Sequence, residues 1–93
     1  MAKLDRRRVN PQPANQIGKR VREARKHLGL SQMACAEAVQ KVIGEIYPGL
    51  SFVIDQTDIS RIESETRPVW DYELRALAKD LLVSSDWLLG ICR

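Results

Sequence analysis

The sequence predicts an all-α domain of five helices, and three observations support that fold class. The chain has 93 residues, 44% of them hydrophobic, which is enough for one modest core and one domain. Apolar residues recur at the i, i+3, i+4, i+7 spacing of a helix face in successive segments. Serine, aspartate and asparagine, which favour helix N-caps, precede these segments. We therefore expect five helices around a single core.

The first 14 residues carry a basic run and then two prolines, Pro11 and Pro13, with little apolar surface. Such a composition blocks helix formation, so we expect a flexible basic arm over residues 1–14 and a folded domain over residues 15–93. Two interpretations of the arm stay open, a DNA-contacting arm that enters the minor groove or follows the backbone, and a solubilising tail. The arginines concerned are Arg6, Arg7 and Arg8.

The first two helices have clear boundary residues. Asn15 is the expected cap of the first helix, and Gly29 offers its stop. Ser31 is a good N-cap for a second helix that starts at Gln32. The apolar positions of the first helix are Ile17, Val21, Ala24 and Leu28. Those of the second are Cys35, Ala36, Val39 and Val42 or Ile43.

Ten residues, 45–54, separate the expected end of the second helix from Asp55. Residues 47–49 favour a turn and residues 52–54 favour extended backbone. Either the second helix runs on, or a small extra element projects. Asp55 is expected to cap a third helix that extends through Glu63, with Asp58 in a reciprocal capping arrangement.

The last two helices are expected after Asp71 and Ser84, which both suit N-caps. The apolar positions of the fourth helix follow the i, i+3, i+4, i+7 pattern: Leu74, Leu77, Ala78 and Leu81. The fifth helix ends at Gly90. Its apolar end either closes the core or meets a second subunit, and consists of Trp87, Leu88, Leu89 and Ile91.

Composition limits the classes of function. Cys35 and Cys92 lie far apart in no metal-ligand spacing, which argues against zinc and disulfides and fits a reducing, cytoplasmic protein. No apolar run approaches the roughly 18 residues that a membrane-spanning helix needs, so no membrane association is expected. Neither a cofactor motif nor a set of residues spaced for catalysis occurs, and His27 has no obvious partner. We expect no enzyme, no cofactor and no metal.

Basic charge is concentrated in the first third of the chain. Residues 1–30 hold nine Lys or Arg against two acidic residues, whereas the whole chain has a net charge of only +3. This distribution favours an anionic partner, although a solubilising tail and a solvated helix face explain it equally well.

The expected third helix has the two faces that DNA reading requires, one packed on the domain and one carrying small polar side chains. Ile59 and Ile62 point inward by spacing. The residues left to point outward are Gln56, Thr57, Ser60 and Arg61.

The order of these pieces resembles the Cro and phage-repressor type of helix-turn-helix domain, the Xre-like regulators. The resemblance covers roughly residues 16–90. It rests on residues 17–22 (IGKRVR) with Arg25, residues 29–32 (GLSQ), residues 58–63 (DISRIE), residues 74–78 and residues 83–90. Residues 67–74 (RPVWDYEL) also resemble a bacterial subgroup with the pattern R-x-V-x-D-x-E-L. The resemblance implies a five-helix repressor-like DNA-binding domain, and in this chain the connection between the second and third helices is lengthened.

The resemblance also implies roles for individual residues. Gln32 would touch a DNA phosphate and brace the reading helix, while Gln56 and Thr57 would reach base edges. Ser60 and Arg61 would add a base or phosphate contact, with Arg61 on phosphate. Arg25 and Glu63 would form a partly buried structural ion pair.

Two features depart from the family pattern. The connection before Asp55 is longer than a tight turn of about 3 to 4 residues, which puts the docking angle of the reading helix in doubt. Glu65 stands where the family usually has a glycine in the left-handed conformation, at a cost of roughly 1 to 2 kcal/mol if that conformation is kept.

The resemblance implies a sequence-specific regulator of transcription, a repressor, that binds double-stranded DNA as a homodimer. The alternative is an antitoxin or adaptor whose main partner is another protein. In that case residues 45–54 or the C-terminal end would be the docking surface.

Overall fold

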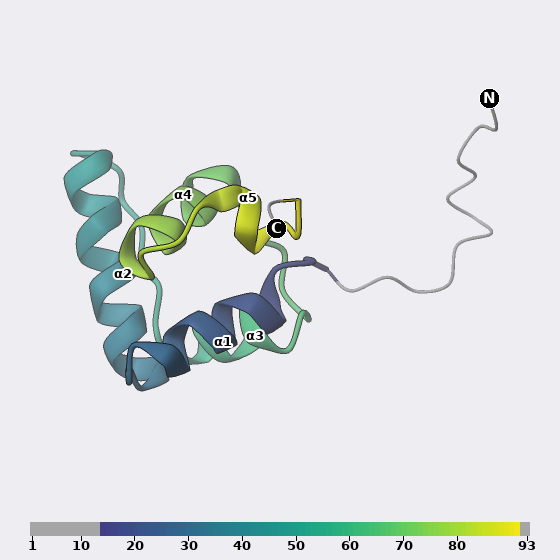
Figure 1. Cartoon of the computed structure of the whole chain (residues 1–93). Coiled ribbons are helices and arrows are strands. Elements are labelled where there is room, and N and C mark those ends of the chain that lie inside the picture. The colour runs from purple at the N-terminus through teal and green to yellow at the C-terminus, as the bar shows by residue number, and fades with distance from the viewer. Residues whose placement is uncertain (1–13, 92–93) are drawn as a thin grey trace, which may run out of the picture.

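The computed structural model describes residues 14–91, which fold into five helices and form no strand over that range. They are α1 (Gly18–His27), α2 (Gln32–Ile46), α3 (Gln56–Glu63), α4 (Asp71–Asp80) and α5 (Ser85–Leu88). The longest helix, α2, stands along one side, with α1 and α3 at the lower edge and α4 and α5 at the upper edge (Figure 1). The predicted all-α, five-helix architecture is confirmed.

All five helices contribute to one core of aliphatic side chains. Burying such a side chain fully contributes about 1.5–3 kcal/mol, so this core provides most of the driving force for folding. Residues with no exposed surface, or almost none, come from each helix: Val21, Cys35, Val39, Ile43, Ile59, Ile62, Leu77 and Leu88. Those of the first four helices lie on the apolar stripe that the helical periodicity predicts.

Side chains satisfy the free backbone N–H groups at most helix starts. The Asn15 Oδ1 accepts hydrogen bonds from the N–H groups of Ile17 and Gly18, both at 3.0 Å, and Ser31 and Ser84 cap α2 and α5. At α4 the expectation is wrong, because Trp70 is the N-cap residue and Asp71 is already helical. The Glu73 carboxylate accepts from the Trp70 N–H at 2.9 Å, and the Asp71 Oδ1 accepts from the Tyr72 N–H at 2.7 Å.

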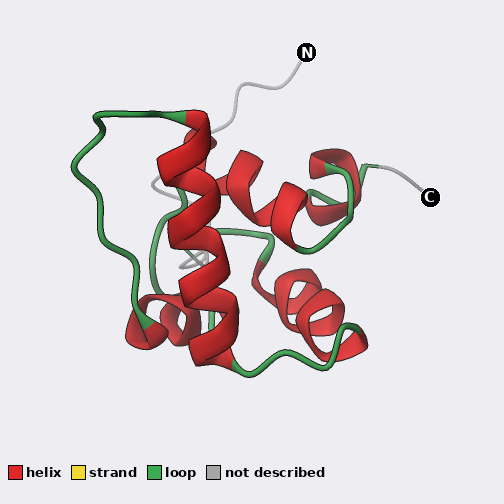
Figure 2. Cartoon of the chain, turned by 90° about the vertical axis from the view of Figure 1, so that its left-hand side faces the viewer, coloured by secondary structure: helices red, strands yellow, loops and turns green. Residues whose placement is uncertain are grey.

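The second helix is longer than expected. It continues to Ile46, whereas the connection was expected to begin at residue 45. The helix therefore runs on by two residues, and most of the expected connection remains outside it. Residues 47–55, the return segment, then run back along α2 from its far end to the start of α3 (Figure 2). They have no regular secondary structure. The return segment thus places α3 beside the first half of α2.

Candidate nucleic-acid interface

Helix α3 has one buried and one exposed face. Ile59 and Ile62 have no exposed surface and Glu63 is 9% exposed, so this side packs on the domain. The other side presents the four polar residues expected to point outward, and all four are exposed: Gln56, Thr57, Ser60 and Arg61. The division between faces therefore follows the predicted pattern.

The first turn of α3 is closed by its own side chains. The Asp55 Oδ1 accepts from the Asp58 N–H at 2.9 Å, and the Asp58 Oδ2 accepts from the Asp55 N–H at 3.0 Å. This reciprocal capping box is the arrangement that the sequence predicts. It satisfies two backbone donors and places carboxylates at the positive end of the helix dipole.

A close approach of α1 fixes the C-terminal end of α3. A Cβ atom at Gly18 would lie 2.3 Å from the Ile62 carbonyl oxygen and 2.8 Å from that of Glu63. Only glycine allows the backbones to come this near. The position of α3 is thus set by backbone contact with α1 at one end.

An ion pair joins the same two helices. The Arg25 Nε donates to Glu63 Oε2 at 2.5 Å and Nη2 donates to Oε1 at 3.0 Å, while Nη1 donates to the Leu30 carbonyl at 2.8 Å. Arg25 is 8% exposed, and its hydrogen bond to Glu63 raises the pKa of the guanidinium. This fork geometry, with Nη1 also bonded to a carbonyl, is the form in which a buried pair is best compensated.

Gln32 lies at the first position of α2 and is bonded to the same carboxylate. Its Nε2 donates to Glu63 Oε1 at 3.2 Å. Gln32 therefore connects α2, α3 and the Arg25 ion pair, which is the bracing contact that the resemblance implied. The side chain is half-buried at the edge of the exposed face of α3. Its contact with a phosphate stays a prediction.

A side chain that sequence analysis did not single out holds the return segment against α2. The Gln40 Nε2 donates to the Phe52 carbonyl at 2.5 Å, and the Gln40 Oε1 accepts from the Ile54 N–H at 2.7 Å. Ile54 is 4% exposed and directly precedes the cap residue Asp55. The start of α3 is thereby tied to the middle of α2.

Aromatic contacts attach the return segment to α4. The Tyr72 ring meets the Phe52 ring edge to face at a centroid distance of 5.4 Å and the Tyr47 ring at 6.0 Å. The Arg75 guanidinium lies 6.0 Å from the centre of the Tyr47 ring. Aromatic pairs in this geometry contribute about 0.5–1.5 kcal/mol each beyond their burial. The return segment is thus packed against α4 at Tyr47 and again at Phe52.

The acidic residues around α3 are largely engaged within the domain. Arg67 lies 3.5 Å from an Asp58 oxygen and makes two hydrogen bonds to Glu73, at 2.6 and 3.0 Å. The bond to Glu73 raises the pKa of the Arg67 guanidinium. Since Glu63 is paired with Arg25, these carboxylates are partly neutralised before any anion approaches.

Helix α3 ends in the left-handed conformation even though no glycine is present. Glu65 has a φ of 63°, its N–H donates to the Ile62 carbonyl at 3.1 Å, and the Thr66 N–H donates to the Arg61 carbonyl at 3.0 Å. The exit conformation of a glycine-terminated helix is therefore kept, with the strain that a side chain imposes there.

A shallow hollow lies beside the start of α3, between α2 and the return segment. Its lining includes Met33 and Ala36 of α2 together with Ile54, Gln56 and Thr57. Met33 is 57% exposed although its side chain is apolar. This methionine could not be predicted as a surface residue of interest, because a single apolar residue in the first turn of a helix does not form part of an i, i+3, i+4 pattern.

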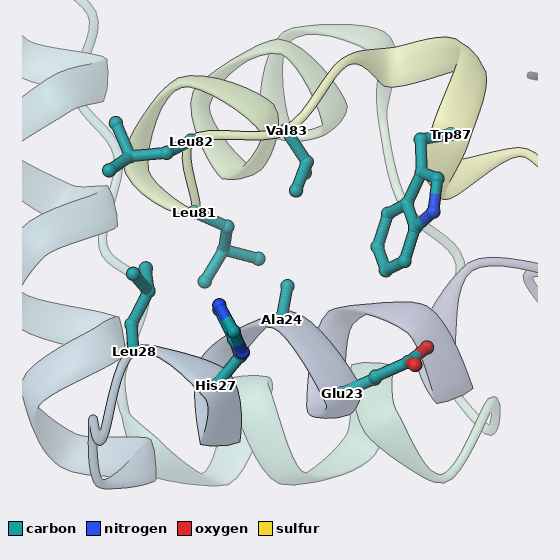
Figure 3. A pocket seen from close by; sticks show the side chains of 8 residues that line it. All are labelled: Glu23, Ala24, His27, Leu28, Leu81, Leu82, Val83 and Trp87. Atoms are coloured by element: carbon teal, nitrogen blue, oxygen red, sulfur yellow. The ribbon is translucent and has the colours of Figure 1, made fainter.

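A larger groove of about 480 Å³ lies between α1 and the α4–α5 turn (Figure 3). Leu28 was expected in the core but caps the end of α1 and is 38% exposed at this groove. Leu82 is 79% exposed and has a φ of 59°. The remaining lining residues are Glu23, Ala24, His27, Leu81, Val83 and Trp87. Of the apolar C-terminal end, Leu88 closes the core, whereas Ile91 is 70% exposed.

Several expected features lie elsewhere or outside the described residues. Arg6, Arg7 and Arg8 fall outside residues 14–91. In that range, no group of three His, Cys, Asp or Glu side chains is placed to hold a metal ion. Cys35 is buried, and burial raises the pKa of its thiol to about 12. None of the helices that can be described is long and apolar enough to cross a bilayer.

Comparison with known proteins adds no relative. No protein-family model, no curated protein and no solved structure matches this chain. A functional interpretation therefore rests on the residues and their geometry.

Proposed function

We propose that this protein is a sequence-specific regulator of transcription, a repressor of the Cro and phage-repressor helix-turn-helix type, which binds double-stranded DNA. The observation that carries the proposal is the division of α3 into a fully packed face and a polar, exposed face. A recognition helix must be held rigidly on one side while its other side enters the major groove, which is wide enough for a helix.

In this proposal the first turn of α3 carries base recognition. Gln56 can donate to N7 and accept from the amino group of adenine with its single amide, and Thr57 offers a hydroxyl and a methyl group to the same groove. Ser60 lies one turn further along the same face. The capping box leaves Gln56 and Thr57 free of any role in starting the helix.

The phosphate contacts would come from both sides of the recognition helix. Arg61 lies on the exposed face of α3, and Gln32 lies at the N-terminus of α2, where backbone N–H groups favour an anion. The basic N-terminal residues Arg6, Arg7 and Arg8 would add electrostatic attraction. Such contacts position the protein on the duplex, while the bases supply specificity.

We further propose that the protein binds as a homodimer, because one small module buries too little surface for tight specific binding. The partly exposed apolar side chains around the groove between α1 and the α4–α5 turn support this proposal. The most exposed of them are Leu82 and Leu28. Sedimentation analysis at several protein concentrations, with and without DNA, tests it.

The test of DNA binding is a gel-shift titration of the purified protein on the DNA upstream of its own gene, at several salt concentrations. We expect affinity to fall linearly with salt on logarithmic axes, with a slope of about 0.9 per phosphate contacted. Arg61→Gln should lower this slope by about one, whereas Glu45→Gln on the outer face of α2 should not lower it. A protein that binds no duplex even at low salt contradicts the proposal.

A second candidate function is that of an antitoxin or adaptor for another protein. The return segment favours it, because Leu50 is 45% exposed and Val53 is 79% exposed on a segment that projects beyond the repressor-like arrangement. Copurification of a stoichiometric protein partner, released by Val53→Asp but not by Gln56→Ala, would support this function over DNA reading.

A further inference from the structure

We propose that Gln40 is a positioning residue for the recognition helix, and that its side-chain amide, rather than a short turn, sets the pose of Gln56 and Thr57. This inference rests on the proposed function and names a residue that determines its specificity. Gln40 itself would touch no DNA. It acts through the two hydrogen bonds that join α2 to the return segment.

The return segment replaces the short covalent tether of a tight turn. In a tight helix-turn-helix, about 3 to 4 residues join the two helices, and this covalent tether fixes the start of the second one. Here the nine residues 47–55 separate the end of α2 at Ile46 from the start of α3. A nine-residue connection restricts the start of α3 far less than a tight turn does, so some other contact must do so.

Gln40 supplies that contact with both halves of its amide. The amide nitrogen donates to the Phe52 carbonyl and the amide oxygen accepts from the Ile54 N–H. The side chain therefore binds the backbone of the return segment at two positions, as the backbone of a neighbouring β-strand would. Ile54 is buried beside the clamp, and only Asp55 separates it from Gln56. A trans peptide spans 3.8 Å between successive Cα atoms, so a displacement at Ile54 passes almost directly to Gln56.

The opposite end of α3 is held independently of Gln40. Gly18 contacts the last turn of α3, and Arg25 and Gln32 bind Glu63, its final residue. Losing the Gln40 clamp would therefore let α3 pivot about its C-terminal end. The helix has eight residues, about 12 Å at 1.5 Å per residue, so the first turn would move most. Hydrogen bonds to base edges tolerate only a few tenths of an ångström, and these contacts would fail first.

The experiment selects duplexes from a random-sequence DNA library with the wild-type protein. It then measures affinity for the enriched duplex and for a scrambled duplex of the same length at several salt concentrations. The variants are Gln40→Ala and Gln40→Glu, the second of which keeps the acceptor for Ile54 but has no donor for Phe52. Gln16→Ala, which removes an exposed amide, is the matched control. Circular dichroism and thermal unfolding establish that each variant is folded.

We expect Gln40→Ala to lower the ratio of enriched to scrambled affinity about tenfold, which corresponds to the loss of one good base contact. Scrambled-duplex affinity and the salt slope should not change. Gln40→Glu sets a carboxylate oxygen against the Phe52 carbonyl and should lower the ratio at least as far as Gln40→Ala, and Gln16→Ala should match the wild type. A variant that is merely unstable would lose both affinities together. Amide exchange gives a readout without DNA, because the Ile54 amide and the first turn of α3 should exchange faster in Gln40→Ala while Ile62 and Glu63 do not.

The outcomes separate the two proposals. If the wild type enriches a sequence and folded Gln40→Ala keeps the same ratio, the positioning role is refuted and the DNA-binding function stands. If the wild type enriches no duplex, both proposals fail. Should Gln40→Ala not fold, Gln40→Glu decides, and an unchanged ratio in that variant refutes the role.

Discussion

The change Glu63→Gln should strongly destabilise the domain, although it keeps the size of the side chain. It replaces a carboxylate that accepts hydrogen bonds from Arg25 and Gln32 by an amide, and it leaves the Arg25 charge 8% exposed without a counter-ion. Breaking a buried pair in this way costs about 3–5 kcal/mol. Domains of this size unfold with roughly 5–14 kcal/mol, at about 0.05–0.15 kcal/mol per residue. The variant should therefore lose about a fifth of its stability or more.

Thermal unfolding followed by circular dichroism measures this loss. At about 4–8 °C per kcal/mol, the Tm should fall by at least 12 °C. Glu45→Gln, an exposed carboxylate on α2, is the control and should change the free energy of unfolding by less than about 0.5 kcal/mol. A Glu63→Gln protein that unfolds within 3 °C of the wild type would refute the reasoning. The same measurement is a control for the DNA-binding assays, because a variant that loses DNA binding by unfolding gives no evidence for a direct contact with DNA.

Three further changes follow from the backbone and from burial. Glu65→Gly removes a side chain at a φ of 63° and should raise the free energy of unfolding by about 1 kcal/mol in urea titrations. Gly18→Ala should lower it by roughly 1–3 kcal/mol, because the new Cβ would meet the Ile62 carbonyl oxygen at 2.3 Å; a neutral effect would contradict the close approach. Burial raises the pKa of Asp80, so its ionised form disfavours folding above that pKa, and this penalty disappears at acid pH. Asp80→Asn should thus stabilise at pH 7 but not at pH 3, and an equal gain at both pH values would rule out the titration.

Local signals predicted most of the helical architecture. Periodicity placed most core residues of the first four helices, and the capping pattern of Asp55 and Asp58 located the start of α3. These features depend on residues within four positions of each other, where helix geometry alone relates side chains. The exposed face of α3 follows for the same reason.

The features that the sequence did not predict have different physical causes. Gln40 binds backbone groups 12 and 14 residues away in a segment without periodicity, so no pattern in the sequence marks it. Asp71 has a residue type that suits an N-cap, but it is the first helical residue, and Glu73, held by Arg67, accepts from the N–H of the N-cap residue Trp70. Leu28 has core spacing, yet it falls at the end of α1, where the chain turns away from the core.

The central claim is that the first turn of α3 reads bases, and selection from a random duplex library with sequencing tests it most directly. Wild type, Gln56→Ala and Thr57→Ala are compared at equal folded concentration. Each substitution should erase the base preference at one or two adjacent positions of the enriched sequence and leave affinity for scrambled DNA unchanged. If both folded variants enrich the same sequence as the wild type with the same strength, α3 does not read DNA through these residues.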